Sequence, residues 1–448
     1  MELRTRKLFN RSFSFVSVIS IILMAFSLVV LLGPIFVKGS SAFLFHGTVE
    51  HRKLMLERFN RGNRAAVEAA ASHAEKARKP VFDLLRGFEA QLDTADVDVR
   101  RQYRNDFVEL KELVLELIGP MPDEPAPALL RQQYGQTRWD RAKIKLNGIL
   151  FVDEYDYSDP TKMGTKVLKP RVERFRGTSL EPLFGMLERG ARDMLMPRLT
   201  LYWQFLFDES YDSHFFGGIW PEMLGTVYLV IGAMLFAIPL GIITAIYLAE
   251  YAGESHFVSM LRTCISSLAG VPSIVFGLFG LAFFINTIKV SQSKSVLAGS
   301  LTLAILVLPT VIRASEEAIK AVPSTYREAS MSLGASQWRT ILSVILPAAL
   351  PGVLTSIIIS MGRAAGETAP IIFTAAVSVG KPLAVWQTLS QPTPALPWNI
   401  YNLATEHQAI DEIRHVQYGM VLALVALVLV LNLTAIIVRA RVSKKLRG

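Results

Sequence analysis

The segment YREASMSLGASQWRTILSVILPAALPG, residues 326–352, lies between two strongly apolar segments, yet its first half is polar. Ser324 precedes it, and we expect its hydroxyl to cap a helix by accepting from free amides of the first turn. Residues 326–333 suffice for two helical turns, and Gly334 supplies the left-handed residue typical of a helix C-terminus. Ser336 can cap a second helix that leads into an apolar run. The pattern predicts a short polar helix held outside a membrane by a glycine elbow.

The composition indicates a polytopic membrane protein with a sizeable polar part. The chain has 448 residues, is 51% hydrophobic and carries a formal net charge of +9, with a mean hydropathy of +0.35. Its one cysteine, Cys264, excludes an internal disulfide. Residues 37–220 hold 28 Lys and Arg against 27 Asp and Glu, whereas the rest holds 19 against 11. The basic excess thus flanks the membrane segments, as orientation signals do, and it does not indicate nucleic-acid binding.

Six segments are long and apolar enough to be candidate membrane spans, since a span needs about 20 apolar residues. They are Phe13–Leu32, Met223–Ala249, Met260–Ile285, Val296–Ile312, a span that opens at Leu346 and runs past Met361, and Gln417–Val438. The first could be taken for a signal peptide, but its apolar run exceeds the usual signal core of roughly 7–15 residues, so we expect an uncleaved anchor.

Basic residues orient these spans. With both termini in the cytoplasm, the cytoplasmic segments hold fourteen Lys and Arg and the short exterior loops hold four, which agrees with the enrichment of cations on the cytoplasmic side. The quoted segment is then cytoplasmic, and residues 37–220 form a periplasmic domain.

The periplasmic insert is predicted to be mixed and mainly helical. Phe107, Leu110, Leu113, Val114 and Leu117 share one face at helical spacing. Residues 142–146 alternate apolar and basic residues like a strand, and the proline-rich residues 119–129 separate the two parts. The acidic-aromatic residues 151–157, FVDEYDY, could bind a cation or a partner, but we expect a solvated loop.

The polar segment resembles a known motif. Glu328-Ala329-Ser330, then Gly334 after three residues, then Val344-Ile345-Leu346-Pro347 after nine, is similar to the EAA loop of ABC importer permeases, EAA-x3-G-x9-I-x-LP. Ser330 replaces an alanine and Val344 an isoleucine. The resemblance implies that this loop, within residues 313–346, docks on an ATPase subunit and transmits the closure of its ATP sites. The residues in that role would be Tyr326, Arg327, Glu328, Ala329, Ser330 and Gly334.

The sequence contains no motif for nucleotide or metal chemistry. It lacks the phosphate cradle G-x-x-x-x-G-K-[ST], and H-E-x-x-H and G-x-S-x-G are also missing. We therefore expect a transport subunit that is not an enzyme, holds no metal or cofactor, and relies on a separate ATPase to bind ATP and magnesium.

Two charges interrupt the fifth apolar segment. Arg363 and Glu367 are four residues apart, so they share a helical face and can pair. Charges within a membrane cost at least roughly 2.5–3.5 kcal/mol each, and they normally face a bundle interior or a polar pathway. One interpretation is a structural ion pair; the other places Arg363 on an anion path, where its planar fork binds oxyanion oxygens. Thr368 would extend this path, and Gly362 with Gly366 would allow close helix packing.

The residues around this pair, GRAAGETAPIIFTA at 362–375, resemble the signature of phosphate-specific permeases of the PstA type. The likeness runs from Trp220 to the C-terminus, and small members of the family lack the insert of residues 37–220. The resemblance implies that the arginine at 363 takes part in phosphate transport. It also implies a second permease of the PstC type, a dimer of ATPases and a periplasmic phosphate-binding protein.

We therefore expect an all-α polytopic protein with six transmembrane helices in the fold of type I ABC importer permeases. Residues 1–36 would form a cytoplasmic arm and the first span, 37–220 the periplasmic domain, and 221–448 the permease core. The expected function is phosphate import across the bacterial inner membrane. A permease for sulfate or molybdate, and a non-transporting sensor or scaffold, are the alternatives.

Overall fold

The computed structural model describes residues 3–125, 127–156, 165–253 and 255–446. The chain divides into two compact units. Unit 1 contains Met1–Ser40, Gln204–Ser210 and Gly217–Gly448, and unit 2 contains Ser41–Trp203 and Tyr211–Phe216. The predicted insert of residues 37–220 overlaps unit 2, although Gln204–Ser210 groups with unit 1. The side of the membrane on which unit 2 lies stays a prediction.

The regular elements of unit 1 are helical, apart from strand residues at its boundary with unit 2, as expected for an all-α permease. Its elements are α1 (Leu3–Ser40), α8 (Trp220–Ile246), the π-helical turn η3 (Tyr247–Tyr251), α9 (His256–Ala269), α10 (Ser273–Gly280), η4 (Leu281–Thr287), α11 (Val296–Lys320), α12 (Ser324–Ser332), α13 (Gln337–Thr340), η5 (Ile341–Ile345), α14 (Leu346–Gly366), α15 (Ala369–Thr374), η6 (Val385–Leu389), α16 (Leu396–Thr405) and α17 (Ile410–Leu446).

Five helical runs in the described residues are long and apolar enough to cross a membrane, and a bent pair makes a sixth if it counts as one span. The runs are Phe13–Ser40, Trp220–Tyr251, Val296–Lys320, Gln337–Gly366 and Ile410–Lys444. The fifth predicted span therefore begins earlier than expected, because α13 and η5 continue directly into α14.

The third predicted span is not a straight helix. α9 and the run from Ser273 to Thr287 meet at an angle of 99°. The break contains Pro272, which has no amide hydrogen to donate and which disfavours the helical conformation in the residue before it. The candidate span Met260–Ile285 therefore corresponds to this bent pair of helices.

Small residues bring α8 and α11 into close contact. A side chain at Gly232 would place its Cβ 2.3 Å from Ser300 Oγ, and one at Gly241 would place it 2.6 Å from Val311 Cγ1. Neither approach leaves room for a larger residue, so the two backbones lie nearer than ordinary side chains permit. We infer that α8 and α11 behave as one rigid pair.

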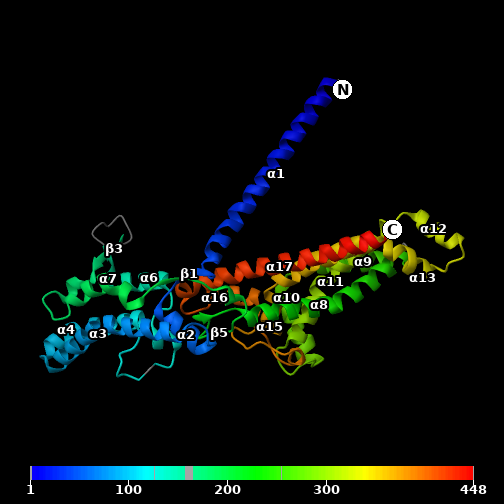
Figure 1. Cartoon of the computed structure of the whole chain (residues 1–448). Coiled ribbons are helices and arrows are strands. Elements are labelled where there is room, and N and C mark those ends of the chain that lie inside the picture. Colours follow the sequence, from blue (N-terminus) through cyan, green and yellow to red (C-terminus); the bar gives the residue numbers. More distant parts are fainter. Residues whose placement is uncertain (1–2, 126, 157–164, 254, 447–448) are drawn as a thin grey trace. The chain divides into compact units, whose positions relative to one another are not determined.

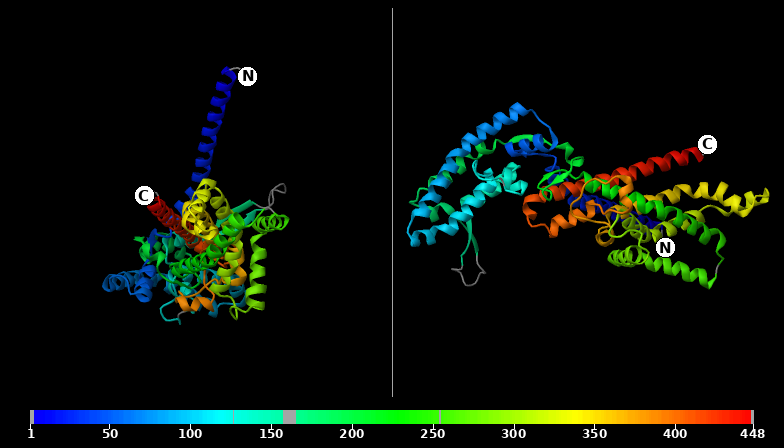
Figure 2. Two further views of the ribbon diagram at one scale, coloured as in Figure 1. Left: turned by 90° about the vertical axis from the view of Figure 1, so that its right-hand side faces the viewer. Right: turned by 90° about the horizontal axis from the view of Figure 1, so that it is seen from below.

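α1 stands apart from the other helices of unit 1 (Figure 1; Figure 2, left). Its apolar window is 0% buried, and it meets α17 near its C-terminal end, where Lys38 Nζ lies 5.0 Å from the centre of the Tyr418 ring. At the same end, Gly39 packs on Leu422. From Phe13 to the contact with α17, the described side chains of α1 are therefore available to lipid or to another chain.

Unit 2 is a helical domain with short antiparallel strand pairs. Its elements are β1 (Leu44–Gly47), α2 (Val49–Phe59), α3 (Arg64–Thr94), α4 (Val97–Ile118), α5 (Leu130–Tyr134), α6 (Trp139–Leu150), β2 (Phe151–Asp156), β3 (Thr165–Pro170), η1 (Arg171–Phe175), α7 (Pro182–Leu195) and β4 (Arg198–Leu201). Three short elements lie at its boundary with unit 1: η2 (Trp203–Leu206), β5 (Ser210–Tyr211) and β6 (Phe216–Gly217). β1 pairs with β4, and β2 pairs with β3.

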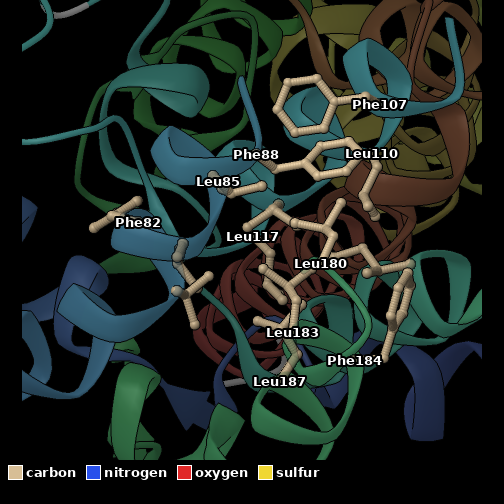
Figure 3. Close-up of a cluster of buried hydrophobic side chains, with 14 of the residues drawn as sticks. Phe82, Leu85, Phe88, Phe107, Leu110, Leu117, Leu180, Leu183, Phe184 and Leu187 are labelled. Carbon is tan, nitrogen blue, oxygen red and sulfur yellow. The ribbon is translucent and has the colours of Figure 1, made fainter. Parts of the chain in front are cut away.

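The core of unit 2 lies between α3, α4 and α7, and Figure 3 shows Phe88 and Leu110 beside Leu117, Leu180 and Leu183. The predicted helical face on α4 is confirmed, because Phe107, Leu110, Val114 and Leu117 are buried and Leu113 packs against the same cluster.

Two local predictions for unit 2 were wrong. Residues 142–146 lie in α6 and not in a strand: Ala142 and Ile149 are buried while Ile144 is exposed, which is helical spacing over a stretch too short to reveal it. Residues 151–156 form strand β2 and not a loop. There Glu154 forms ion pairs with Lys169 at 2.8 Å and with Arg174 at 3.3 Å. Two basic side chains of the same domain therefore already pair with this carboxylate. Tyr157 lies outside the described residues.

A buried histidine makes the stability of unit 2 depend on pH. His51 is surrounded by the rings of Phe45, Tyr202 and Phe216. Burial, followed by the positive charges of Arg138 and Arg52, lowers the pKa of His51 to about 3. The unfolded chain protonates this histidine near pH 6.5. The stabilisation of unit 2 by the neutral, buried histidine is therefore complete above pH 6.5. As the pH falls toward 3, the free energy of unfolding decreases by up to about 1.4 kcal/mol per pH unit.

We expect hydrogen exchange at the amides of α2 in the full-length protein to accelerate between pH 6.5 and 4.5, beyond the intrinsic change in exchange chemistry. His51→Gln should flatten this dependence. His73→Gln is the control, because His73 is exposed. An unchanged slope in His51→Gln would assign the effect to other groups.

Candidate functional site

The polar segment forms the predicted helix and elbow. α12 covers Ser324–Ser332 and is followed by Gly334 with φ +83°, the left-handed conformation that glycine adopts without strain. Ser336 caps α13 by accepting the amide of Arg339 at 3.4 Å. The expected cap at Ser324 was wrong: Ser324 is already within the helix, and its neighbour Pro323 occupies the cap position. α12 and α13 lie at the end of unit 1 opposite α15 and α16 (Figure 1; Figure 2, right).

Arg327 fixes α12 to η3, the turn that continues α8. Its Nε lies 3.1 Å from each carboxylate oxygen of Glu250, and its Nη2 lies 2.5 Å from Oε1. The guanidinium also donates to the carbonyls of Val322 at 2.7 Å and Ile319 at 3.1 Å. The Arg327 side chain is 24% exposed and that of Glu250 is 7% exposed. The hydrogen bonds with Glu250 raise the pKa of Arg327, and the charged fork joins three elements in one fixed geometry.

Two further hydrogen bonds hold the elbow. Ser330 Oγ lies 2.9 Å from Thr340 Oγ1, which connects α12 to α13 across Gly334. Gln337 Nε2 donates to the carbonyl of Glu250 at 2.8 Å. The residue that replaces an alanine of the EAA pattern, Ser330, thus has a structural partner in this chain.

The opposite side of the elbow is open and apolar. Tyr326, Met331 and Trp338 are 51%, 55% and 56% exposed, and Leu333 is 90% exposed. Glu328 and Ala329 are exposed beside them. Of the predicted coupling residues, Tyr326, Glu328 and Ala329 therefore face outward, whereas Arg327 and Ser330 face the bundle. Exposed apolar patches of this kind mark protein interaction sites.

A second charged cluster supports the same end of the bundle. Glu316 on α11 accepts from Arg262 Nε at 3.0 Å and from Lys320 Nζ at 2.6 Å, and Arg262 also donates to the carbonyl of Leu248 at 2.8 Å. Sequence analysis missed Glu250, because its partner Arg327 lies 77 residues away along the chain. It also missed Glu316, whose partner Arg262 lies 54 residues away, although the spacing of four residues to Lys320 was a local signal.

Arg363 and Glu367 form the predicted pair where α14 ends. Arg363 Nε lies 3.4 Å from Glu367 Oε1, and the side chains are 38% and 19% exposed. α14 ends at Gly366, so Glu367 has an extended backbone and lies just beyond the helix, contrary to the expectation that both charges lie within it. Among the described residues, Arg363 has this one long bond through Nε, which leaves the outer edge of its fork open.

The chain turns at Thr368 into α15. Thr368 is the first flanking residue of this helix, and its carbonyl accepts the amide of Ile371 at 3.2 Å. Pro370 lies in the first turn of α15, where a missing amide hydrogen costs nothing. The proline therefore lies at the start of a new helix, after the break that follows Gly366.

The two predicted packing glycines differ. A Cβ on Gly362 would lie 3.8 Å from Val428 and 3.9 Å from Asn432 on α17, whereas one on Gly366 would meet nothing within 4 Å. Gly362 thus faces α17, and any close packing at Gly366 would have to involve another chain.

Two polar atoms near the pair were not foreseen. Ser360 is fully buried, and neither its Oγ nor Asn432 Oδ1 has a hydrogen-bond partner among the described residues. Unpaired buried polar atoms are costly. Together with Arg363 and Glu367, these two atoms make the C-terminal end of α14 polar.

The sequence of the permease core is similar to those of known transport proteins. Residues 237–448 match the model of the family described as "Binding-protein-dependent transport system inner membrane component". The chain is 34% identical over 255 residues to the probable ABC transporter permease protein YqgI of Bacillus subtilis, covering 55% of this chain and 86% of that protein.

Two further relatives are phosphate transport system permease proteins. PstA 1 of Mycobacterium tuberculosis is 35% identical, covering 52% of this chain and 74% of that protein. PstA of Yersinia pestis is 36% identical, covering 50% and 73%. Unit 2 lies outside the residues that the family model matches. The chain therefore belongs to the inner membrane components of binding-protein-dependent transport systems, as an ABC importer permease of the PstA type.

Proposed function

We propose that this chain is a permease subunit of an ATP-driven importer that carries inorganic phosphate across the bacterial inner membrane. The importer would contain a second permease of the PstC type, two ATPase copies and a periplasmic phosphate-binding protein. The observation that carries this proposal is the anchored helix α12 in a chain similar to named phosphate permeases. Its polar side is fastened by Arg327 to Glu250, and its apolar side is open.

The proposed topology has both termini in the cytoplasm and unit 2 in the periplasm. The greater number of basic residues in the segments assigned to the cytoplasm supports it. In this orientation α12 faces the cytoplasm, where ATP is available. The partner ATPase would bind ATP and magnesium, and this chain would supply the surface on which that ATPase docks.

Coupling would proceed through the contacts of α12. An ATPase that covers Tyr326 and Leu333 buries apolar surface, which favours association. When the ATPase sites close, they displace α12. The hydrogen bonds from Arg327 to Glu250 then transmit this displacement to α8, and its close contact with α11 carries the movement into the bundle.

The anion path would include Arg363, Glu367 and Thr368. The open edge of the Arg363 fork can donate two parallel hydrogen bonds to a phosphate. Glu367 holds the arginine through Nε when no anion is present, and its charge repels an anion that remains. The weak 3.4 Å bond suits a group that must exchange partners during each cycle.

Two alternatives use the same structure. Sulfate and molybdate present similar oxygens to an arginine, so a permease for either would need no other site. A non-transporting sensor or scaffold would use unit 2 and would have no need for an open, anchored α12.

Transport by the reconstituted complex separates these functions. We expect vesicles that contain this chain, its partner permease and the ATPase, oriented with the ATPase side toward the lumen and with the phosphate-binding protein outside, to accumulate radiolabelled phosphate only when ATP is enclosed in the lumen. Excess sulfate or molybdate should not compete. Competition by sulfate would favour the broader oxyanion permease, and ATP hydrolysis without uptake of any oxyanion would favour the sensor.

A further inference from the structure

The two strands that begin and end unit 2 form a ribbon with two different faces. β1 and β4 pair antiparallel, so that Leu44 lies opposite Leu201 and His46 lies opposite Leu199. Because side chains alternate across a strand, these four residues share one face. Phe45 lies on the other face, where it is buried against Arg138 at 4.0 Å from the ring centre.

The first face is apolar and uncovered. Leu44, Leu199 and Leu201 are 52%, 62% and 67% exposed, and Trp203, two residues beyond Leu201, is 58% exposed. His46 is the polar member of the face and is also exposed. Contiguous exposed leucines with an adjacent tryptophan are unusual on a water-exposed domain and mark an interaction surface.

Chain connectivity places this face close to the membrane. α1 ends at Ser40, and Leu44 follows after only four residues, so their Cα atoms are at most about 14 Å apart. The described apolar span of α1, Phe13–Ser40, is about 42 Å long at 1.5 Å per residue and exceeds a hydrocarbon core of about 30 Å. Its C-terminal end therefore lies in the headgroup region, and Leu44 must lie near it.

We propose that the outward face of the β1–β4 ribbon, formed by Leu44, Leu199, Leu201 and Trp203, rests in the lipid interface of the leaflet where α1 ends. Leucines there reach the upper acyl chains, and tryptophan prefers the boundary between acyl chains and headgroups. His46 tolerates this boundary because its imidazole can hydrogen-bond headgroups and water. The inference depends on α1 crossing the membrane and is independent of which anion is transported.

Accessibility of spin labels in lipid vesicles tests the proposal. The background is the full-length chain with Cys264→Ala, reconstituted in vesicles of phosphatidylethanolamine and phosphatidylglycerol. Single labels are placed through Leu44→Cys, Leu199→Cys and Leu201→Cys. Arg198→Cys is the matched control, because Arg198 is exposed on the same strand but on the opposite face. Ser72→Cys on α3 is the reference for water.

We expect labels on the apolar face to gain collisions with oxygen, which concentrates in lipid, and to lose collisions with a water-soluble nickel chelate relative to Ser72. The Arg198 label should retain nickel collisions. Nickel access equal to that of Ser72 at all three positions would overturn the proposal. Loss of collisions with both reagents would also overturn it, since a protein surface then covers the face. Three positions on two strands guard against one variant that misfolds.

Discussion

Replacing Arg363 with glutamine should reduce ATP-dependent phosphate uptake by about 100-fold or more while the transporter still assembles. Glutamine keeps much of the side-chain length but removes the charge and the planar fork. Two hydrogen bonds to a charged group contribute about 1.5–3 kcal/mol each, and 1.4 kcal/mol corresponds to a factor of ten. Loss of both bonds therefore removes most anion recognition at this position. Uptake of radiolabelled phosphate by whole cells measures the effect.

Companion variants identify the property that matters. Arg363→Lys retains a charge without the fork, so we expect an intermediate loss of uptake. Glu367→Gln should leave Arg363 in place but remove the carboxylate charge that repels a bound anion. Phosphate should therefore leave the site more slowly. Co-purification of the ATPase with each variant controls for assembly. Uptake that is normal in Arg363→Gln would reduce the pair to a structural contact between α14 and the residue after it.

Replacing Arg327 with alanine should uncouple ATP hydrolysis from uptake. The variant loses all contacts of the guanidinium with Glu250, Val322 and Ile319, and it leaves the nearly buried Glu250 carboxylate without its cation. Removing one partner of a buried pair costs up to about 3–5 kcal/mol. The partial exposure of Arg327 reduces this value, so we expect about 1–3 kcal/mol of local stability to be lost.

Local stability and coupling are measured separately. Hydrogen exchange should accelerate in α12 by about tenfold or more, while α3 in unit 2 stays unchanged. ATP hydrolysis by the complex should persist without proportionate uptake. Arg339→Ala is the matched control, since this exposed arginine of the same elbow has no side-chain hydrogen bond among the described residues. Equal exchange in Arg327→Ala and the native protein would contradict the anchoring role.

The double substitution Glu250→Gln with Arg327→Gln tests the pair itself. If the two side chains act through each other, the combined loss of stability should be smaller than the sum of the single losses by about 0.5–3 kcal/mol. Simple additivity would mean that the two residues act independently.

The sequence predicted features that depend on neighbouring residues. The elbow at Gly334 and the cap at Ser336 are local, and both are confirmed. The apolar face of α4 was predicted because a long helix repeats its pattern several times. The strand assigned to residues 142–146 was wrong, since five residues cannot separate a strand from one turn and a half of helix.

Features that depend on distant contacts could not be read from the sequence. Glu250 resembles any acidic residue at the end of a span, and its importance appears only when Arg327 is folded against it. The bend at Pro272 carried a signal, because proline follows Val271 within an apolar run, but composition alone counted the segment as one span. The extended backbone at Glu367 depends on the start of α15 and likewise needed the structure.

α8 and η3 together give the molecule a lever. One helical run joins the point where the chain leaves unit 2, near Trp220, to the carboxylate of Glu250 that holds α12. At 1.5 Å per residue this run is about 46 Å long, so a tilt of about five degrees about one end displaces the other by about 4 Å. A displacement at the Trp220 end of this run therefore reaches Glu250 and α12 without any change in the anion route, because one continuous helical run connects the two ends.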